Sequence, residues 1–233
     1  MRSSVLAVVA HPDDESFGLG ALLSSASAAG SRAGVLCLTH GEASTLHGVE
    51  GDLREIRERE LRAAAKRLGL CWLRLLDHPD GAVASDQAKV TADVAAAVGS
   101  FHPDVLLVFD PNGITGHPDH QAATRAAVAV GRRHNIDVVA WTLPASVTDV
   151  MADEGMAMFA GVPDDAVQVT VAVDRSTQLE AVQEHPSQAV PGSPLWRRLE
   201  LLGDREHLRY LHSTGRASLP FGVEAATVRE CTS

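Results

Sequence analysis

Aromatic residues are scarce in this chain, which has 233 residues and only 4% Phe, Trp and Tyr. That shortage disfavours an aromatic-rich β-sandwich. Alanine, valine and leucine dominate instead, which favours helices packed on a sheet of branched side chains. The length allows one substantial core, or one domain with a small appended lobe.

Cysteine is also rare, and the three residues have no C-x-x-C spacing: Cys37, Cys71 and Cys231. Cys37 lies in an apolar run, where a small core residue is more usual than a metal ligand or half of a disulfide. This usage favours a reducing, cytoplasmic compartment.

Long hydrophobic runs and excess positive charge are missing as well. The first apolar run, Val5–Ala10, is too short for a signal peptide or a membrane span, and no other stretch reaches membrane length. Acidic residues outnumber basic ones by 30 to 20, which gives a formal net charge of −10. Because phosphate binding needs clustered Lys and Arg, we expect no nucleic-acid partner. The short apolar runs predict no membrane partner.

Strand-like and helix-like segments alternate through the first two thirds of the chain. Apolar runs and alternating patterns predict strands at Val5–Ala10, Gly34–Thr39, Cys71–Leu76, Val105–Asp110 and Asp137–Leu143. Helical spacing predicts helices at Glu15–Ala29, Leu53–Leu68, Asp86–Val98 and Asp119–His134. Such repeats with short links predict an α/β fold: a Rossmann-like, doubly wound, mainly parallel sheet with helices on both faces.

The segment after Pro144 is less regular. A strand near Val167–Val173, a helix from about Ser176 to His185 and a turn at Pro191–Pro194 can be distinguished. We therefore divide the chain into a Rossmann-like, metal-binding catalytic core at residues 1–143 and a C-terminal extension at residues 144–233. The extension is expected to complete the fold and to shape the substrate pocket.

Two dense polar motifs each follow a predicted buried strand. The first is Ala10-His11-Pro12-Asp13-Asp14-Glu15, and the second is Gly116-His117-Pro118-Asp119-His120. Ligands of open α/β sheets bind beyond the carboxyl ends of the strands, where the strand order reverses. With the strand order 3-2-1-4-5, both motifs would meet in one crevice.

The residue types in these motifs suit a catalytic divalent ion. Catalytic zinc commonly takes three His or carboxylate ligands and leaves a position for water. The candidate groups are His11, Asp13, Asp14 and His120, with His117 close by. Of two adjacent aspartates, one can bind the ion while its neighbour transfers protons. The alternative is structural, since a His-Pro pair can form a turn and an aspartate can cap the following helix.

Together the two motifs resemble the LmbE-like, or PIG-L, family of zinc-dependent de-N-acetylases, which includes the deacetylases of the mycothiol and bacillithiol pathways. The resemblance extends from about residue 4 to 190 and includes Arg57-Glu58-Arg59-Glu60, Pro79-Asp80-Gly81, Pro103-Asp104 and His185-Pro186-Ser187-Gln188. It implies a metal-dependent amidohydrolase that removes an N-acetyl or related N-acyl group from a small molecule.

The resemblance also implies a role for each of these residues. Three residues would bind zinc: His11, Asp14 and His120. Iron(II) or another divalent ion also suits this ligand set. Asp13 would be the general base, and His117 would polarise the amide oxygen. Asp119 would hydrogen-bond His117 and fix its orientation. Glu15 and His185 are expected to have structural roles.

The resemblance implies less about substrate recognition than about the metal site. Arg57 and Asp80 match positions that bind substrate hydroxyls in sugar-processing relatives, so an N-acetylglucosamine-type sugar is the expected substrate. Some mycothiol-pathway relatives have an oxyanion-assisting tyrosine two residues before the first His of the second motif. This chain has Thr115 there, and its only tyrosine is Tyr210. Either His117 works with the metal alone, or a group from the C-terminal region helps.

Other functions fit parts of the pattern. An amidase that acts on a thiol S-conjugate or an antibiotic intermediate belongs to the same reaction class. A non-catalytic metal- or sugar-binding protein would need neither Asp13 nor His117, and a metallophosphoesterase would need more ligands for two metal ions. The pattern is compatible with a homo-oligomer.

Overall fold

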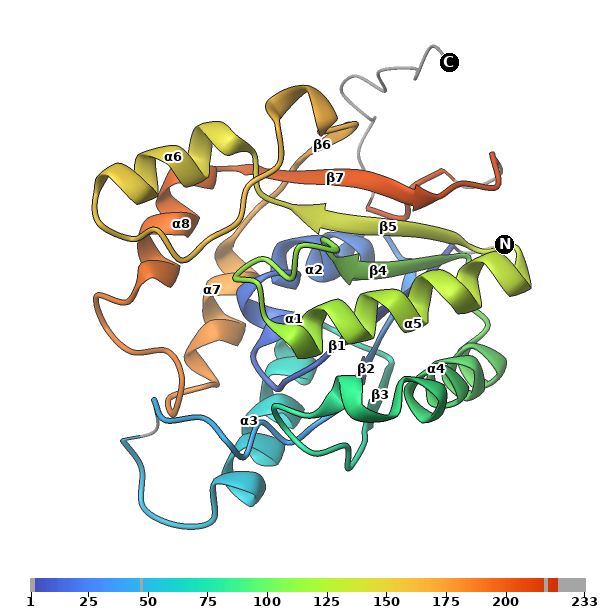
Figure 1. Cartoon of the computed structure of the whole chain (residues 1–233), viewed down its shortest axis with the longest axis horizontal. Helices are drawn as coiled ribbons and strands as arrows, with labels where there is room; N and C mark the ends of the chain where they lie inside the picture. Colours follow the sequence, from blue (N-terminus) through green and yellow to red (C-terminus); the bar gives the residue numbers. More distant parts are fainter. Residues whose placement is uncertain (1–2, 47, 216–217, 222–233) are drawn as a thin grey trace.

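The computed structural model describes residues 3–46, 48–215 and 218–221 (Figure 1). Within these residues a seven-stranded sheet has the order β3-β2-β1-β4-β5-β7-β6. Its strands are β1 (Ser4–Val9), β2 (Arg32–Cys37), β3 (Trp72–Leu75), β4 (Val105–Phe109), β5 (Asp137–Thr142), β6 (Val169–Ala172) and β7 (Arg205–His212). The predicted α/β class and the predicted order of the first five strands are confirmed.

The strand order reverses between β1 and β4. From β1 the chain crosses to β2 on one side, whereas β4 pairs with β1 on the other side, in the register Val5 to Val105 and Ala7 to Leu107. The first five strands pair in parallel, so their carboxyl ends lie at the same edge of the sheet. The residues that follow β1 and β4 are therefore neighbours. Ligands of such sheets bind at this position.

Helices cover both faces of the sheet (Figure 1). They are α1 (Asp14–Phe17), α2 (Gly20–Ala28), α3 (Leu53–Arg67), α4 (Gln87–Phe101), α5 (Pro118–His134), α6 (Ala145–Asp153), α7 (Ser176–Gln183) and α8 (Pro194–Leu202), with short 3-10 helices at Val83–Asp86 and Asp164–Ala166. No helix in the described part of the chain combines the length and the apolar character needed to cross a membrane.

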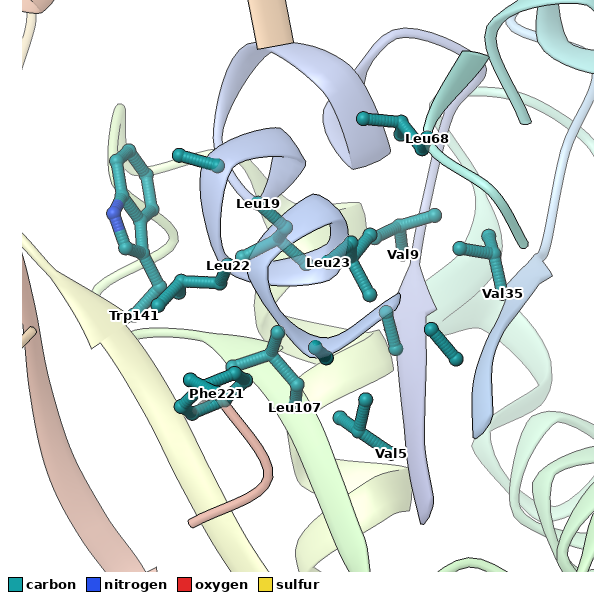
Figure 2. Close-up of a cluster of buried hydrophobic side chains, with 14 of the residues drawn as sticks. Val5, Val9, Leu19, Leu22, Leu23, Val35, Leu68, Leu107, Trp141 and Phe221 are labelled. Carbon is teal, nitrogen blue, oxygen red and sulfur yellow. The ribbon is translucent and has the colours of Figure 1, made fainter. Parts of the chain in front are cut away.

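The two faces of β1 enter two separate cores, because successive side chains of a strand point in opposite directions. Val5 and Val9 pack with α2 and α3, whereas Leu6 and Val8 pack with α4 and α5. Figure 2 shows the leucines of α2 between Trp141 on one side and Val9 on the other. β1 is thus buried on both faces, as its continuous apolar run indicates.

The predicted helix Glu15–Ala29 is wrong as a single element, because α1 and α2 are separated at Gly18 and Leu19. A Cβ atom on Gly18 would lie 2.5 Å from Cε1 of Phe109, so the glycine allows β4 to approach the end of α1 closely. The break leaves α1 as a single turn that carries Asp14, at the carboxyl end of β1.

Residues after Pro144 contribute to the same sheet. β6 falls within the predicted strand, but β7, α6 and α8 are absent from the sequence prediction. β7 pairs antiparallel with both β5 and β6 and so completes the sheet. The division of the chain at residue 143 stays a prediction, and Cys231 lies outside the described residues.

Candidate metal centre and active site

The two polar motifs meet at the carboxyl edge of β1 and β4. His11 follows β1, and the second motif begins α5, with His117 before the helix and Pro118 as its first residue. His11, Asp14 and His120 each offer one ligand atom, and these atoms lie within 4.8 Å of one another. The predicted convergence of the three ligands therefore matches the geometry.

The surrounding backbone orients these three side chains. Oδ2 of Asp14 accepts hydrogen bonds from the amides of Ala10 at 3.1 Å and His11 at 2.9 Å. Nδ1 of His120 donates to the carbonyl oxygen of Gly113 at 3.0 Å, which fixes the ring and leaves Nε2 to face Oδ1 of Asp14 at 3.1 Å. Such a backbone partner is the usual way to orient a metal-binding histidine.

The electrostatics of the cluster favour a bound positive charge. Burial opposes protonation of His11, but the carboxylates of Asp119, Asp14 and Asp80 raise its pKa well above the ordinary value. Burial likewise opposes protonation of His120, and Asp14 raises its pKa. The two histidines in turn hold the pKa of Asp14 well below its ordinary value, although burial acts in the other direction.

Two nitrogen atoms of this cluster lack a hydrogen-bond partner among the described residues. They are Nε2 of His11 and Nε2 of His120, both buried. Buried polar atoms are normally paired, so each such exception calls for an explanation. Together with the carboxylate of Asp14, these nitrogens form a donor set that fits a divalent cation.

Asp13 lies beside the cluster in an unusual backbone conformation. Its φ is 109°, in a region that non-glycine residues rarely adopt and that costs about 1–3 kcal/mol. Its carboxylate lies 3.1 Å from Nη2 of Arg57. Burial, reinforced by the neighbouring Asp14, raises the pKa of Asp13 to about 6, against the opposing effect of Arg57. A base with such a pKa is suited to proton transfer near neutral pH.

Arg57 lies behind Asp13 and is only 3% exposed. Its Nη1 donates to the carbonyl oxygen of Gly41 at 2.7 Å, and its Nη2 donates to the carbonyl oxygen of Pro12. A Cβ on Gly41 would lie 2.0 Å from Nη1, so the glycine makes room for the guanidinium. The guanidinium of Arg57 thus points toward the first motif. The contact of Arg57 with the substrate stays a prediction.

His117 and Asp119 are linked through the backbone. Nδ1 of His117 accepts a hydrogen bond from the amide of Asp119 at 3.2 Å, whereas the Asp119 carboxylate accepts from the amides of Gly81 at 2.7 Å and Val83 at 3.1 Å. The expectation that the carboxylate itself holds His117 is not met in the described residues. Burial, helped by nearby histidines, lowers the pKa of His117. A neutral ring with Nδ1 as acceptor carries its proton on Nε2.

Asp80 also faces the metal cluster. Its Oδ1 lies 3.0 Å from Nε2 of His11, within ion-pair distance but without the direction of a hydrogen bond. Its Oδ2 accepts from the amide of Ala43 at 2.8 Å. The turn at Pro79-Asp80-Gly81 thus supplies both a carboxylate near His11 and an amide to Asp119, while the predicted sugar contact of Asp80 stays a prediction.

The sequence pattern did not reveal the structural role of Glu60, whose side chain is buried. Glu60 accepts hydrogen bonds from the amide and the hydroxyl of Ser187, at 3.0 and 2.6 Å. It stands three residues after Arg57 on the buried face of α3, together with Leu61 and Ala64. That spacing of three and four residues is the signal that could have placed Glu60 on the inner face of the helix.

Tyr210 does not replace the tyrosine that some relatives have at the position of Thr115. It pairs with Val139, three residues before the end of β5, and so lies away from the carboxyl edge of the sheet. Thr115 itself is exposed.

Comparison with known proteins finds relatives in sequence and in fold. A curated relative, the 1D-myo-inositol 2-acetamido-2-deoxy-alpha-D-glucopyranoside deacetylase of Mycolicibacterium gilvum (strain PYR-GCK), is 31% identical over 195 residues, which are 71% of this chain and 67% of the relative. The solved structure of the A40926 pseudoaglycone deacetylase Dbv21 has a TM-score of 0.71 at 21% identity and covers 90% of this chain and 97% of that one. N,N'-diacetylchitobiose deacetylase from Pyrococcus horikoshii has a TM-score of 0.65 at 22% identity, with 90% and 84% covered.

The two structures show a shared fold, and the family follows from the sequence itself. The model of the PIG-L family, described as GlcNAc-PI de-N-acetylase, matches residues 6–130, which contain both motifs. Because this match spans more than half of the 233 residues, the chain belongs to the PIG-L family of de-N-acetylases.

Proposed function

We propose that this protein is a zinc-dependent N-deacetylase that hydrolyses the N-acetyl amide of an N-acetylglucosamine-type sugar. The observation that carries the proposal is the convergence of His11, Asp14 and His120 within 4.8 Å. The Asp13 carboxylate interacts electrostatically with Asp14 and His11, and the ring of His117 lies 4.7 Å from that of His11 between centroids. A passive metal site would need neither Asp13 nor His117.

The proposed ion is held by one nitrogen of His11, one nitrogen of His120 and the carboxylate of Asp14. When bound, a divalent ion supplies a Lewis acid that makes water more acidic and polarises the amide carbonyl. Two imidazoles and one carboxylate are a ligand set that suits zinc and that also suits iron(II).

Asp13 is proposed to transfer the protons. As a water oxygen attacks the carbonyl carbon, the Asp13 carboxylate accepts the water proton. It then returns that proton to the nitrogen as the C–N bond breaks, so acetate and a free amine leave. A positioned acid–base group typically contributes about 10²–10⁴-fold to the rate.

His117 is proposed to stabilise the negative charge that develops on the amide oxygen. Its Nδ1 is occupied by the amide of Asp119, so its Nε2–H is the free donor. Because a lowered pKa keeps the ring neutral, the donor adds no full charge to the already cationic centre. Donors of this kind are typically worth several kcal/mol.

A sugar substrate is supported by the curated relatives, which are named as deacetylases of an acetamido-glucopyranoside. Solved neighbours of the same fold are named as deacetylases of a diacetylated disaccharide and of an antibiotic pseudoaglycone. Residues 144–233, which the family match does not cover, are the proposed source of specificity between such substrates. A cytoplasmic location is part of the proposal and is supported by the free thiols of Cys37 and Cys71.

The direct test measures the release of a free amine from N-acetylglucosaminyl-inositol, N,N'-diacetylchitobiose and a thiol S-conjugate, with zinc-loaded protein. We expect release from at least one N-acetylated sugar and a loss of about 10²–10⁴-fold in kcat for Asp13→Ala. Asp204→Ala is the matched control, because this carboxylate is 84% exposed.

Equal rates for the wild type and Asp13→Ala would contradict the role of Asp13 as the base. Release from the thiol conjugate alone would replace the sugar substrate, and no release from any amide would refute the enzymatic proposal. A ratio of two bound ions per chain with phosphatase activity would favour a metallophosphoesterase instead.

A further inference from the structure

One buried polar cluster has no part in the proposed chemistry. Glu15 and His185 are fully buried, with 0% of each side chain exposed. Nε2 of His185 donates to Oε1 of Glu15 at 2.7 Å, and the hydroxyl of Ser16 donates to the same oxygen at 2.7 Å. Side chains that can carry charge are rarely buried so completely unless they are paired.

The second carboxylate oxygen of Glu15 contacts Asp13. Oε2 accepts a hydrogen bond from the backbone amide of Asp13 at 2.9 Å. This amide belongs to the residue with a φ of 109°. Glu15 is therefore held through one oxygen by His185 and Ser16, and with the other oxygen it holds the strained peptide of Asp13.

His185 is fixed from two sides. Its ring packs edge-on against Phe17 of α1, with a centroid distance of 5.9 Å. Two residues later, the amide and the hydroxyl of Ser187 bind Glu60 of α3. Because α1 and α3 both anchor this segment, the imidazole is a rigid support for the Glu15 carboxylate.

The neighbouring ligand Asp14 is oriented independently of this pair. Its carboxylate is bound by the amides of Ala10 and His11, at the end of β1. Loss of the His185 contact should therefore disturb Asp13 while metal binding persists.

We propose that His185 and Glu15 are positioning residues for Asp13. His185 fixes the carboxylate of Glu15, which holds the backbone of Asp13 in the conformation that presents its side chain to the reacting amide. The catalytic consequence rests on the proposed function, whereas the support of the Asp13 backbone does not.

Substitution at His185 tests the catalytic consequence. His185→Leu removes the donor, and we expect kcat to fall on the order of 100-fold, the scale of a small misplacement of a catalytic group. KM and zinc affinity, measured by competition with a chelating dye, should stay close to the wild type. His185→Gln should recover much of kcat, because its amide N–H can donate to Glu15.

Ser187→Ala is the matched control. It removes the hydroxyl bond to Glu60 but keeps the bond from the backbone amide of residue 187 to Glu60, so the segment stays anchored, and it leaves the contact between His185 and Glu15. We expect a lower stability and an unchanged kcat. If His185→Leu does not fold, His185→Asn takes its place, since its shorter side chain does not reach Glu15.

A second measurement is independent of activity. Hydrogen exchange of the Asp13 amide, followed by NMR, should be slow in the wild type and in His185→Gln, and faster in His185→Leu. An unchanged exchange rate, an unchanged kcat in an active enzyme, or an equal loss of kcat in Ser187→Ala would each overturn the inference. If the wild type releases no amine, the proposed function fails, and the exchange rate alone decides whether His185 holds Asp13.

Discussion

At the scale of single residues, one guanidinium joins three parts of the chain. Arg57 on α3 binds the carbonyl oxygens of Pro12 and Gly41 and lies 3.1 Å from the carboxylate of Asp13. A buried cation so close to a carboxylate favours the ionised form of that carboxylate. Arg57 therefore influences the protonation of the proposed base.

This pair leads to a prediction on pH dependence. Asp13 acts as a base only when it is deprotonated, so kcat/KM should rise with pH through its pKa, which burial raises to about 6. This value already includes the lowering by Arg57, and a bound cation would lower it further, so we expect the acid limb of the zinc enzyme at or below about pH 6. Arg57→Gln should move the limb upward by about 1 unit or more.

The pH profile of kcat/KM for hydrolysis of an N-acetylated sugar is the measurement. Arg57→Lys keeps a positive charge and is the control, with a limb closer to that of the wild type. A limb at the same pH in Arg57→Gln would show that the guanidinium does not act on Asp13.

Sequence patterns predicted which residues of the site meet, but not how each side chain points. His11 and His120 could be brought together from the order of parallel strands alone. The direction of Arg57 toward Asp13 depends on the open space at Gly41, and the carboxylate of Asp119 is taken by amides of a turn near residue 80. Both depend on tertiary contacts that no local pattern encodes.

At the scale of secondary structure, the break between α1 and α2 is the feature with the sharpest consequence. Helical spacing continues through this region, so the sequence predicts one helix. Close packing of Phe109 against Gly18 overrides the spacing and separates the turn that carries Asp14 from α2. Tertiary packing of this kind commonly outweighs local propensity.

Two glycine substitutions test this interpretation. Gly18→Ala places a methyl group 2.5 Å from Phe109 and should lower the free energy of unfolding by about 1–3 kcal/mol. Gly99→Ala lies in α4 with open space around its Cβ and should raise it by about 0.5–1 kcal/mol. Urea unfolding of the metal-free variants measures both, and a Gly18→Ala protein as stable as the wild type would refute the packing account.

At the scale of the whole molecule, the proposed metal site joins distant parts of the sequence. His11 and His120 come together because β1 and β4 pair, so the unfolded chain has no such site. An ion that binds the folded state alone adds about 2.7 kcal/mol of stability at a concentration 100 times its Kd. We expect zinc to raise Tm by roughly 5–10 °C.

Differential scanning calorimetry with zinc or with a chelator checks this expectation. His120→Ala should abolish the shift in Tm, whereas His134→Ala, exposed at the far end of the same helix, should keep it. A full shift in His120→Ala would place the ion elsewhere.

The parallel half of the sheet could be predicted as a whole, but its antiparallel end could not. β7 has charged or imidazole side chains at five of its eight positions, so its apolar signal is weak. Glu206 nevertheless faces inward at 0% exposure, where Nε1 of Trp141 donates to it at 2.6 Å and Arg175 pairs with it. A strand whose inward carboxylate is neutralised by partners from elsewhere cannot be found from hydrophobic alternation.

The position of β7 between β5 and β6 also bears on how the protein is made. Every residue of the proposed metal centre lies before position 121, yet β5 gains its second neighbour only when residues 205–212 are available. The chain is synthesised from the N-terminus onward, at roughly 5–20 residues per second. A chain that extends only to the end of α5 thus contains all the ligands of the proposed ion, but it lacks β5, which pairs with β4, and β7, which pairs with β5.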